Sequence, residues 1–167
     1  MADTDALRPE QLETYFALME AVSLLQHAVE QQLQAEGGLS SVQFQLLARL
    51  ADAGRPLTMT ELADGVVYSR SGLTHQAGLL EKGGFITRVH SPDDQRATLV
   101  TITDAGLARV SQVLPGHIEV TRRLLFDALS AQDLHALRDI MNRARDHMRA
   151  QPSRSAAPRK RPRDRRA

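Results

Sequence analysis

The stretch that decides the fold runs from Leu57 to Gly106 and reads LTMTELADGVVYSRSGLTHQAGLLEKGGFITRVHSPDDQRATLVTITDAG. Near its start, Thr58 is followed three residues later by Glu61. At this spacing the two side chains can each bond the other residue's backbone N–H, which stabilises a helix N-terminus. The pattern predicts a short helix that begins directly after Thr58. A second helix is expected from Ser69 to Lys82, with only a brief connection between the two.

The second helix, Ser69–Lys82, has two faces of different chemistry. Its apolar residues recur at spacings of three and four, which places them on one side of a helix. These inward-facing residues are Leu73, Ala77 and Leu80. The opposite face then carries small or polar residues, namely Arg70, Ser71, Thr74, His75 and Gly78. The pair Gly83-Gly84 is expected to end the helix, because glycine adopts the left-handed backbone conformation that closes many helices.

A β-hairpin is expected directly after this helix. Bulky and polar side chains alternate from Phe85 to His90, and Ala97 to Thr103 is rich in β-branched residues. Between these two segments, Ser91–Arg96 contains a proline and two aspartates and reads as a turn with a cationic tip. Two helices followed by such a hairpin predict a mainly α-helical fold with a small β-hairpin, the winged helix-turn-helix. A major groove about 12 Å wide admits one α-helix with small or polar outward residues.

Long amphipathic helices are expected on both sides of this stretch. Apolar residues recur at helical spacing across Pro9–Glu36, where Gly37-Gly38 ends the pattern, and again across 104–149. A small winged-helix body cannot cover an apolar stripe as long as that of Pro9–Glu36, so a second copy of the chain is the better cover. We therefore expect a homodimer.

The stretch Leu57–Gly106 resembles the MarR family of bacterial regulators. The similar features are Leu62-Ala63 in the first helix, Ser71 and Thr74 through Leu80-Glu81-Lys82-Gly83 in the second helix, Asp94 and Arg96 in the wing, and Thr103 with Ala105-Gly106 after it. With the flanking helices, the resemblance covers roughly residues 9–149. The sequence departs from many family members at His75, where an arginine is common, and at Gln95, where another basic residue is common.

The resemblance implies a two-fold dimer formed by the first and last helices, with paired recognition helices in successive major grooves of double-stranded DNA. It also implies that Arg96 enters the minor groove while Asp94 orients it. A small-molecule effector would enter between the dimerisation helices and the winged-helix lobe. The candidate DNA-binding residues are Ser69, Arg70, Ser71, Thr74, His75, Gln76, Arg88, Asp94 and Arg96. The alternative for the polar helix face is a solvated surface without function.

Metal, cofactor and enzyme chemistry are not expected. The chain has no Cys, and its six His are scattered without the i,i+4 pairing that would place two of them together on a helix. It has no nucleophile elbow, phosphate-binding loop or dinucleotide fingerprint. His27, Glu30 and His117 could converge if their helices cross, but core or surface roles are the simpler interpretation.

We expect residues 1–152 to form one MarR-like domain, with the winged helix-turn-helix at 57–103 and dimerisation helices at 9–36 and 104–149. Residues 153–167 carry seven Lys and Arg against Asp164 alone and are expected to form a basic disordered tail. The chain begins without a basic-then-apolar leader and has no membrane-length apolar run, so a soluble cytoplasmic protein without a membrane partner is expected.

The sequence therefore predicts a dimeric transcription regulator that binds a pseudo-palindromic operator and acts as a repressor released by a small molecule. Two alternatives stay open. The protein could be a constitutive DNA-binding regulator without a ligand, or a winged-helix module that docks a partner protein.

Overall fold

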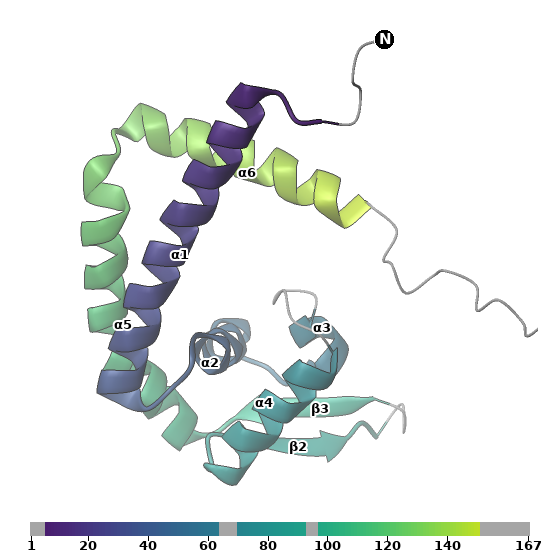
Figure 1. The fold of residues 1–167 in the computed structure, drawn as a ribbon. Helices are drawn as coiled ribbons and strands as arrows, with labels where there is room; N and C mark the ends of the chain where they lie inside the picture. Colours follow the sequence, from purple (N-terminus) through teal and green to yellow (C-terminus); the bar gives the residue numbers. More distant parts are fainter. Residues whose placement is uncertain (1–5, 64–69, 93–96, 151–167) are drawn as a thin grey trace, which may run out of the picture. The chain divides into compact units, whose positions relative to one another are not determined.

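A computed structural model describes residues 6–63, 70–92 and 97–150. The chain forms two compact units, an N-terminal unit that ends at Leu125 and a C-terminal unit that begins at Phe126. The N-terminal unit holds, in chain order, α1 (Pro9–Gly37), α2 (Ser41–Ala53), β1 (Leu57–Thr58), α3 (Met59–Ala63), α4 (Arg70–Lys82), β2 (Ile86–His90), β3 (Thr98–Ile102) and α5 (Asp104–Leu124). The described elements thus confirm the mainly helical winged helix-turn-helix, shown in Figure 1.

Two helices, α2 and α5, are capped at their N-terminal ends by local side chains. Ser40 accepts a hydrogen bond from the backbone of Gln43 at 3.2 Å, and the Gln43 side chain accepts one from the Ser40 backbone at 3.0 Å. These reciprocal bonds satisfy two backbone donors that the first turn of α2 would otherwise leave without partners. At α5, the Thr103 hydroxyl accepts from the backbone N–H of Gly106 at 3.1 Å. Both helices therefore begin where local side-chain chemistry places them.

The sheet has three antiparallel strands in the order β1-β3-β2. The hairpin of β2 and β3 was predicted, and it pairs Ile86 with Ile102 and Arg88 with Val100. Strand β1 is an addition to the prediction, and it pairs Leu57 with Val100. Two residues are too few to show an alternating pattern, so β1 has no signal of its own in the sequence.

The hydrophobic core lies between the sheet and the helices of the N-terminal unit. Its fully buried larger side chains come from α1, the α1–α2 connection, α2, α3, α4, β3 and α5: Leu33, Leu39, Leu46, Leu47, Leu50, Leu62, Leu73, Leu80, Val100 and Val113. Burying a side chain of this size contributes about 1.5–3 kcal/mol to folding. The core thus joins the winged helix to the long helices.

Helices α1 and α5 lie side by side in the N-terminal unit, as Figure 1 shows in purple and green. The amide of Gln32, a residue that is 9% exposed, donates to the backbone oxygen of Val113 at 3.0 Å. One turn away, the Gln112 amide donates to the backbone oxygen of Glu36 at 2.5 Å. The C-terminal half of α1 is therefore fixed to α5 by polar as well as apolar contacts.

The C-terminal unit contains the short 3-10 helix η1 (Phe126–Ala128) and helix α6 (Ala131–Ala150). Ser130 lies directly before α6, and the Asp133 carboxylate accepts hydrogen bonds from its backbone N–H and its hydroxyl at 2.9 and 2.7 Å. These bonds lower the pKa of the Asp133 carboxyl. The apolar side chains of α6 that the sequence places on one face include Leu134, Ile140, Met141 and Met148, all exposed. Across the described residues, no helix is both long enough and apolar enough to span a membrane.

Candidate nucleic-acid interface

Helix α4 has the two faces that its sequence predicts. Leu73, Ala77 and Leu80 are each at most 1% exposed and fix one side of the helix against the core. Thr74 and His75 lie on the exposed side. The buried side of α4 therefore fixes the helix against the core. Its exposed side presents a threonine and a histidine to solvent.

The C-terminal end of α4 is closed by the predicted glycine pair. The backbone N–H of Gly83 bonds the Leu79 carbonyl at 3.0 Å, and that of Phe85 bonds the Leu80 carbonyl at 3.0 Å. Gly84 has φ of 75°, a conformation that strains residues with a side chain. The backbone of Gly83–Phe85, which connects α4 to the hairpin, is therefore held in one conformation by these hydrogen bonds and by the glycine.

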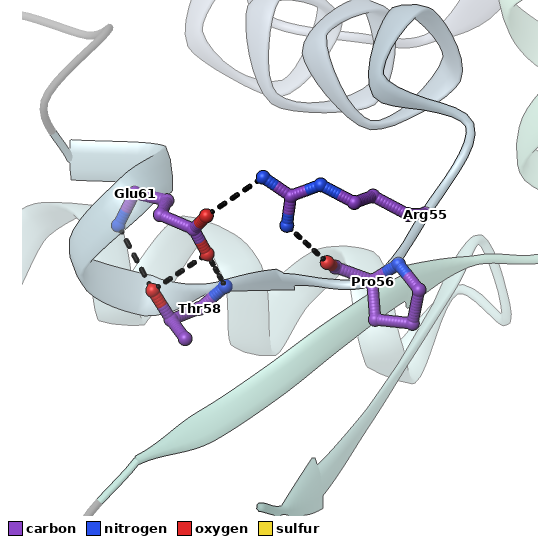
Figure 2. A network of polar contacts seen from close by, with 4 residues as sticks. All are labelled: Arg55, Pro56, Thr58 and Glu61. Carbon is purple, nitrogen blue, oxygen red and sulfur yellow. Dashed lines mark hydrogen bonds and ion pairs between the residues drawn. The ribbon is translucent and has the colours of Figure 1, made fainter.

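Helix α3, the first helix of the motif, is anchored by a network of four residues (Figure 2). The Glu61 carboxylate accepts from the Thr58 backbone at 2.7 Å, and the Thr58 hydroxyl accepts from the Glu61 backbone at 3.1 Å. Arg55 donates to the other Glu61 oxygen at 2.9 Å and also to the Pro56 carbonyl. The hydrogen bonds from Thr58, and next the bond from Arg55, lower the pKa of Glu61 to about 2. The predicted capping box is thus confirmed.

An ion pair joins α4 to the first wing strand. Arg88 on β2 donates from Nε and Nη2 to the same oxygen of Glu81, at 3.0 and 2.6 Å. The Arg88 guanidinium lowers the pKa of the Glu81 carboxyl. An Arg88 nitrogen also lies 3.9 Å from the position that a Cβ on Gly78 would occupy. Arg88 therefore lies along the flank of α4, and its guanidinium is beside that helix.

The predicted site residues fall into three groups in the structure. Thr74 and His75 come together on the exposed side of α4, with Arg88 on its flank. Gln76 is half-buried, and its Oε1 is enclosed without a hydrogen-bond partner among the described residues. The remaining candidates lie outside the described residues, entirely or in their side chains: Ser69, Asp94 and Arg96 entirely, and Arg70 and Ser71 in their side chains.

Sequence reasoning missed the residues that position this surface. Glu81 orients Arg88, and Arg55 completes the network at α3. Glu81 and Arg88 have opposite charges at the end of a helix and in the next strand, a signal that could have suggested their pairing. Arg55 carries no such signal, because the loop that places it beside Glu61 follows no periodic pattern.

Histidine and carboxylate side chains do not gather into a metal site in the part of the chain that the structure describes. Glu30 bonds the backbone and hydroxyl of Ser41, at 2.7 and 2.5 Å. His117 packs against Phe44, with ring centroids 4.6 Å apart, and its burial lowers the pKa of its imidazole. The possible convergence of His27, Glu30 and His117 is thus not found. Glu30 contacts Ser41 and His117 contacts Phe44 instead.

This chain is similar to known proteins both in sequence and in structure. A sequence model described as the MarR family matches residues 37–97. The structure is similar to Sco3205 of Streptomyces coelicolor, a MarR family transcriptional regulator whose crystal structure was solved in complex with DNA. The two are 32% identical, the match covers 92% of this chain and 95% of Sco3205, and the TM-score is 0.84.

Two further relatives extend this similarity. The crystal structure of AbsC, a MarR family transcriptional regulator from the same organism, matches with a TM-score of 0.82 and 28% identity, over 89% of this chain and 100% of AbsC. The HTH-type transcriptional repressor YetL of Bacillus subtilis is 34% identical over 107 residues. That match spans 64% of this chain and 64% of the length of YetL.

Proposed function

Since the chain belongs to the MarR family of transcription regulators, we propose that it is a homodimeric, sequence-specific DNA-binding regulator that acts as a repressor. The observation that carries this proposal is the exposed pair Thr74 and His75 on a helix whose opposite side is buried, directly before a β-hairpin. Small polar residues let a helix backbone approach base edges in a major groove. The similarity to Sco3205, a regulator solved with DNA, supports the same role.

In the proposed complex, α4 enters the major groove and the wing contacts the adjacent minor groove. Thr74 and His75 would read base edges, and Arg88 would supply a cation beside them. Arg96, which Asp94 would orient, is our candidate for the minor groove, since narrow minor grooves attract arginine. Both wing-tip residues lie outside the described residues. In this proposal α4 recognises the DNA sequence through base edges, whereas the arginines contact phosphates and the minor groove.

We attribute dimerisation to the apolar surface of α1 and to the helices that follow the wing. Tyr15, Phe16 and Met19 are 50%, 63% and 45% exposed, although large apolar side chains of this kind are usually covered. A two-fold dimer would cover them with the same surface of a second copy. Such a dimer places two recognition helices on half-sites about one helical turn, 10–10.5 base pairs, apart.

A small molecule is our candidate for the signal that releases the repressor from DNA. A cavity of about 280 Å³ in the N-terminal unit is lined by Leu50, Ala51, Gly54, Arg55, Pro56, Thr101, Ile102 and Leu107. Its lining comes from α2, the connection that follows α2, β3 and the start of α5, so an effector there would lie between α5 and the wing strand β3. Its size suits a molecule of one ring, and its apolar walls with Arg55 suit a phenolic or similar small anion. Release requires that the ligand prefer one conformation of the dimer.

We further propose that residues 1–152 act as one family domain and that the basic segment 153–167 adds contact with DNA phosphates. A regulator of this type would act on chromosomal DNA in the cytoplasm. We expect no catalytic activity, in keeping with a family of transcription regulators. The proposals on the domain, the location and the lack of catalysis rest on membership of the family. The proposal on residues 153–167 rests on the positive charge of that segment.

The experiment that tests the proposal is a gel shift with the full chain. It is titrated into duplex DNA from directly upstream of its own gene and into a scrambled duplex of equal length. A repressor of this kind binds the upstream duplex at lower protein concentration, and a phenolic acid then releases it. Release by no ligand favours the constitutive regulator. Failure to bind the upstream duplex even at low salt favours the protein-interaction module.

A further inference from the structure

Three element ends meet at one place in the N-terminal unit: the C-terminus of α1, the C-terminus of α4 and the first turns of α5. The last turn of α1 has no basic residue to offset the partial negative charge of its carbonyl end. Arg109, on α5, donates from Nη1 to the backbone oxygen of Gly37, the last residue of α1. A guanidinium from another helix therefore serves as the missing cation of α1.

The same guanidinium also contacts the joint between the recognition helix and the wing. The central carbon of the Arg109 guanidinium lies 4.8 Å from the centroid of the Phe85 ring, within cation–π range. Phe85 is held on both sides, because its N–H bonds the Leu80 carbonyl on α4 and its carbonyl accepts from the N–H of Thr103, both at 3.0 Å. Arg109 thus links the end of α1 to a residue that is fixed to the last turn of α4.

Tight packing leaves this link little room to adjust. A Cβ on Gly37 would overlap the side chain of Val113 and lie 3.3 Å from Cδ of Arg109. A Cβ on Gly106 would overlap the backbone oxygen of Phe85. Because α5 packs this closely against α1 at Gly37 and against the α4–β2 connection at Gly106, a shift of α1 would move Arg109 and, through it, Phe85.

We propose that Arg109 is a positioning residue for DNA binding, which sets the orientation of α4 relative to α1 through Gly37 and Phe85. This inference rests on the proposed function, in which α1 forms the dimer and α4 reads DNA. In such a dimer, the orientation of α4 on α1 determines the separation of the two recognition helices. Arg109 therefore acts on DNA affinity without contact to DNA.

The test compares DNA affinities per folded dimer for Arg109→Ala, Phe85→Leu and the double variant. The probe is a duplex that the parent full chain enriches from a random pool. Each single variant is expected to weaken binding roughly 3- to 30-fold, the range found for residues that couple distant sites. The double variant should bind no more weakly than the weaker single variant, because both changes break one link. Arg109→Lys, which keeps the charge, should recover part of the affinity.

Two measurements separate positioning from other roles. The slope of log affinity against log salt should stay unchanged in Arg109→Ala, whereas loss of a direct phosphate contact lowers it by about one. Arg49→Ala, which removes the same charge from an exposed position of α2, is the matched control and should bind as the parent does. If Arg109→Ala does not fold, Arg109→Lys and Phe85→Leu carry the test.

Parent-like affinity for the folded Arg109 and Phe85 variants would overturn the inference and leave the proposed function standing. Additive losses in the double variant, or a lower salt slope, would overturn it as well. A parent chain that enriches no duplex at all removes the proposed function and this inference together.

Discussion

Glu81, in the last turn of α4, lies 2.6 Å from Arg88 on the wing strand β2, so one ion pair joins the recognition helix to the wing. The Glu81 and Arg88 side chains are 37% and 27% exposed, which leaves the pair within reach of solvent and of a bound polyanion. Arg88 keeps the pKa of the Glu81 carboxyl below its usual value. The pair therefore fixes the direction of a cation beside α4 while it offsets part of that cation's charge.

We expect Glu81→Gln to release Arg88 and to add one net positive charge near the DNA. Binding to unrelated duplexes should become tighter, and its salt dependence steeper, because a freed arginine attracts any phosphate. The ratio of specific to unrelated binding should fall, since Arg88 loses its orientation. Gel shifts with both duplexes over a series of salt concentrations measure this. An unchanged ratio and slope would show that the ion pair has no role in binding.

Arg96→Ala should weaken DNA binding by about 1–3 kcal/mol, as expected for loss of a specific arginine contact, while the dimer stays intact. The measurement is a titration of the specific duplex at fixed salt, with sedimentation to confirm the dimer. Affinity equal to that of the parent would remove Arg96 from the mechanism.

His75→Ala should change which sequences are bound more than how tightly they are bound. The imidazole lies on the exposed side of α4, where its ring nitrogens can form hydrogen bonds with base edges. Selection from a random duplex pool compares the variant with the parent, and His135→Ala on α6 serves as the control. Identical selected sequences for His75→Ala and the parent would contradict this role.

Much of the fold follows from local sequence signals. The caps at Ser40, Thr58 and Thr103 fix where helices begin, and the spacing of Leu73 and Leu80 fixes which side of α4 is buried. These features depend on residues three or four positions apart, which a single sequence displays directly.

The parts that escaped prediction depend on residues far apart in the sequence. Strand β1 exists because Leu57 meets Val100, and the link at Arg109 exists because Gly37 and Phe85 both lie within reach of its guanidinium. No spacing rule connects such positions, since they come together only through packing of the core. The part of the candidate site that lies on one face of α4 could be predicted from the sequence. The contacts by which residues of neighbouring elements position that face could not.

The Glu61 network predicts a definite pH dependence of stability. The Glu61 carboxylate has a pKa of about 2 in the folded protein and about 4.5 when unperturbed, so it stabilises the fold above pH 4.5. That stabilisation is lost as the pH falls from about 4.5 to about 2. Glu61→Gln should therefore be less stable than the parent at neutral pH, and the difference should shrink across this window.

Urea unfolding of both proteins at several pH values measures the difference in the free energy of unfolding. Thr58→Ala is a companion variant that should cost about 1 kcal/mol through loss of the helix cap. A difference between Glu61→Gln and the parent that stays constant down to pH 2 would show that the carboxylate charge is irrelevant.

The exposed apolar side of α1 should be sensitive to a charge if it forms the dimer interface. Phe16→Lys would bury an ammonium against a second copy, which is costly without a partner carboxylate. The neighbouring Ala17→Lys is the matched control, because it lies on the helix face that carries Glu13 and Glu20. Sedimentation should find a monomer for Phe16→Lys and a dimer for Ala17→Lys. A dimer of parent-like stability for both would place the interface elsewhere.

The most direct test of DNA reading by a dimer is selection of duplexes from a random pool, followed by a count of the chains bound to the enriched sequence. Two chains bound to one inverted repeat, with half-sites about 10–10.5 base pairs apart, are the predicted result. No enriched sequence, or one chain bound to an asymmetric site, would contradict it.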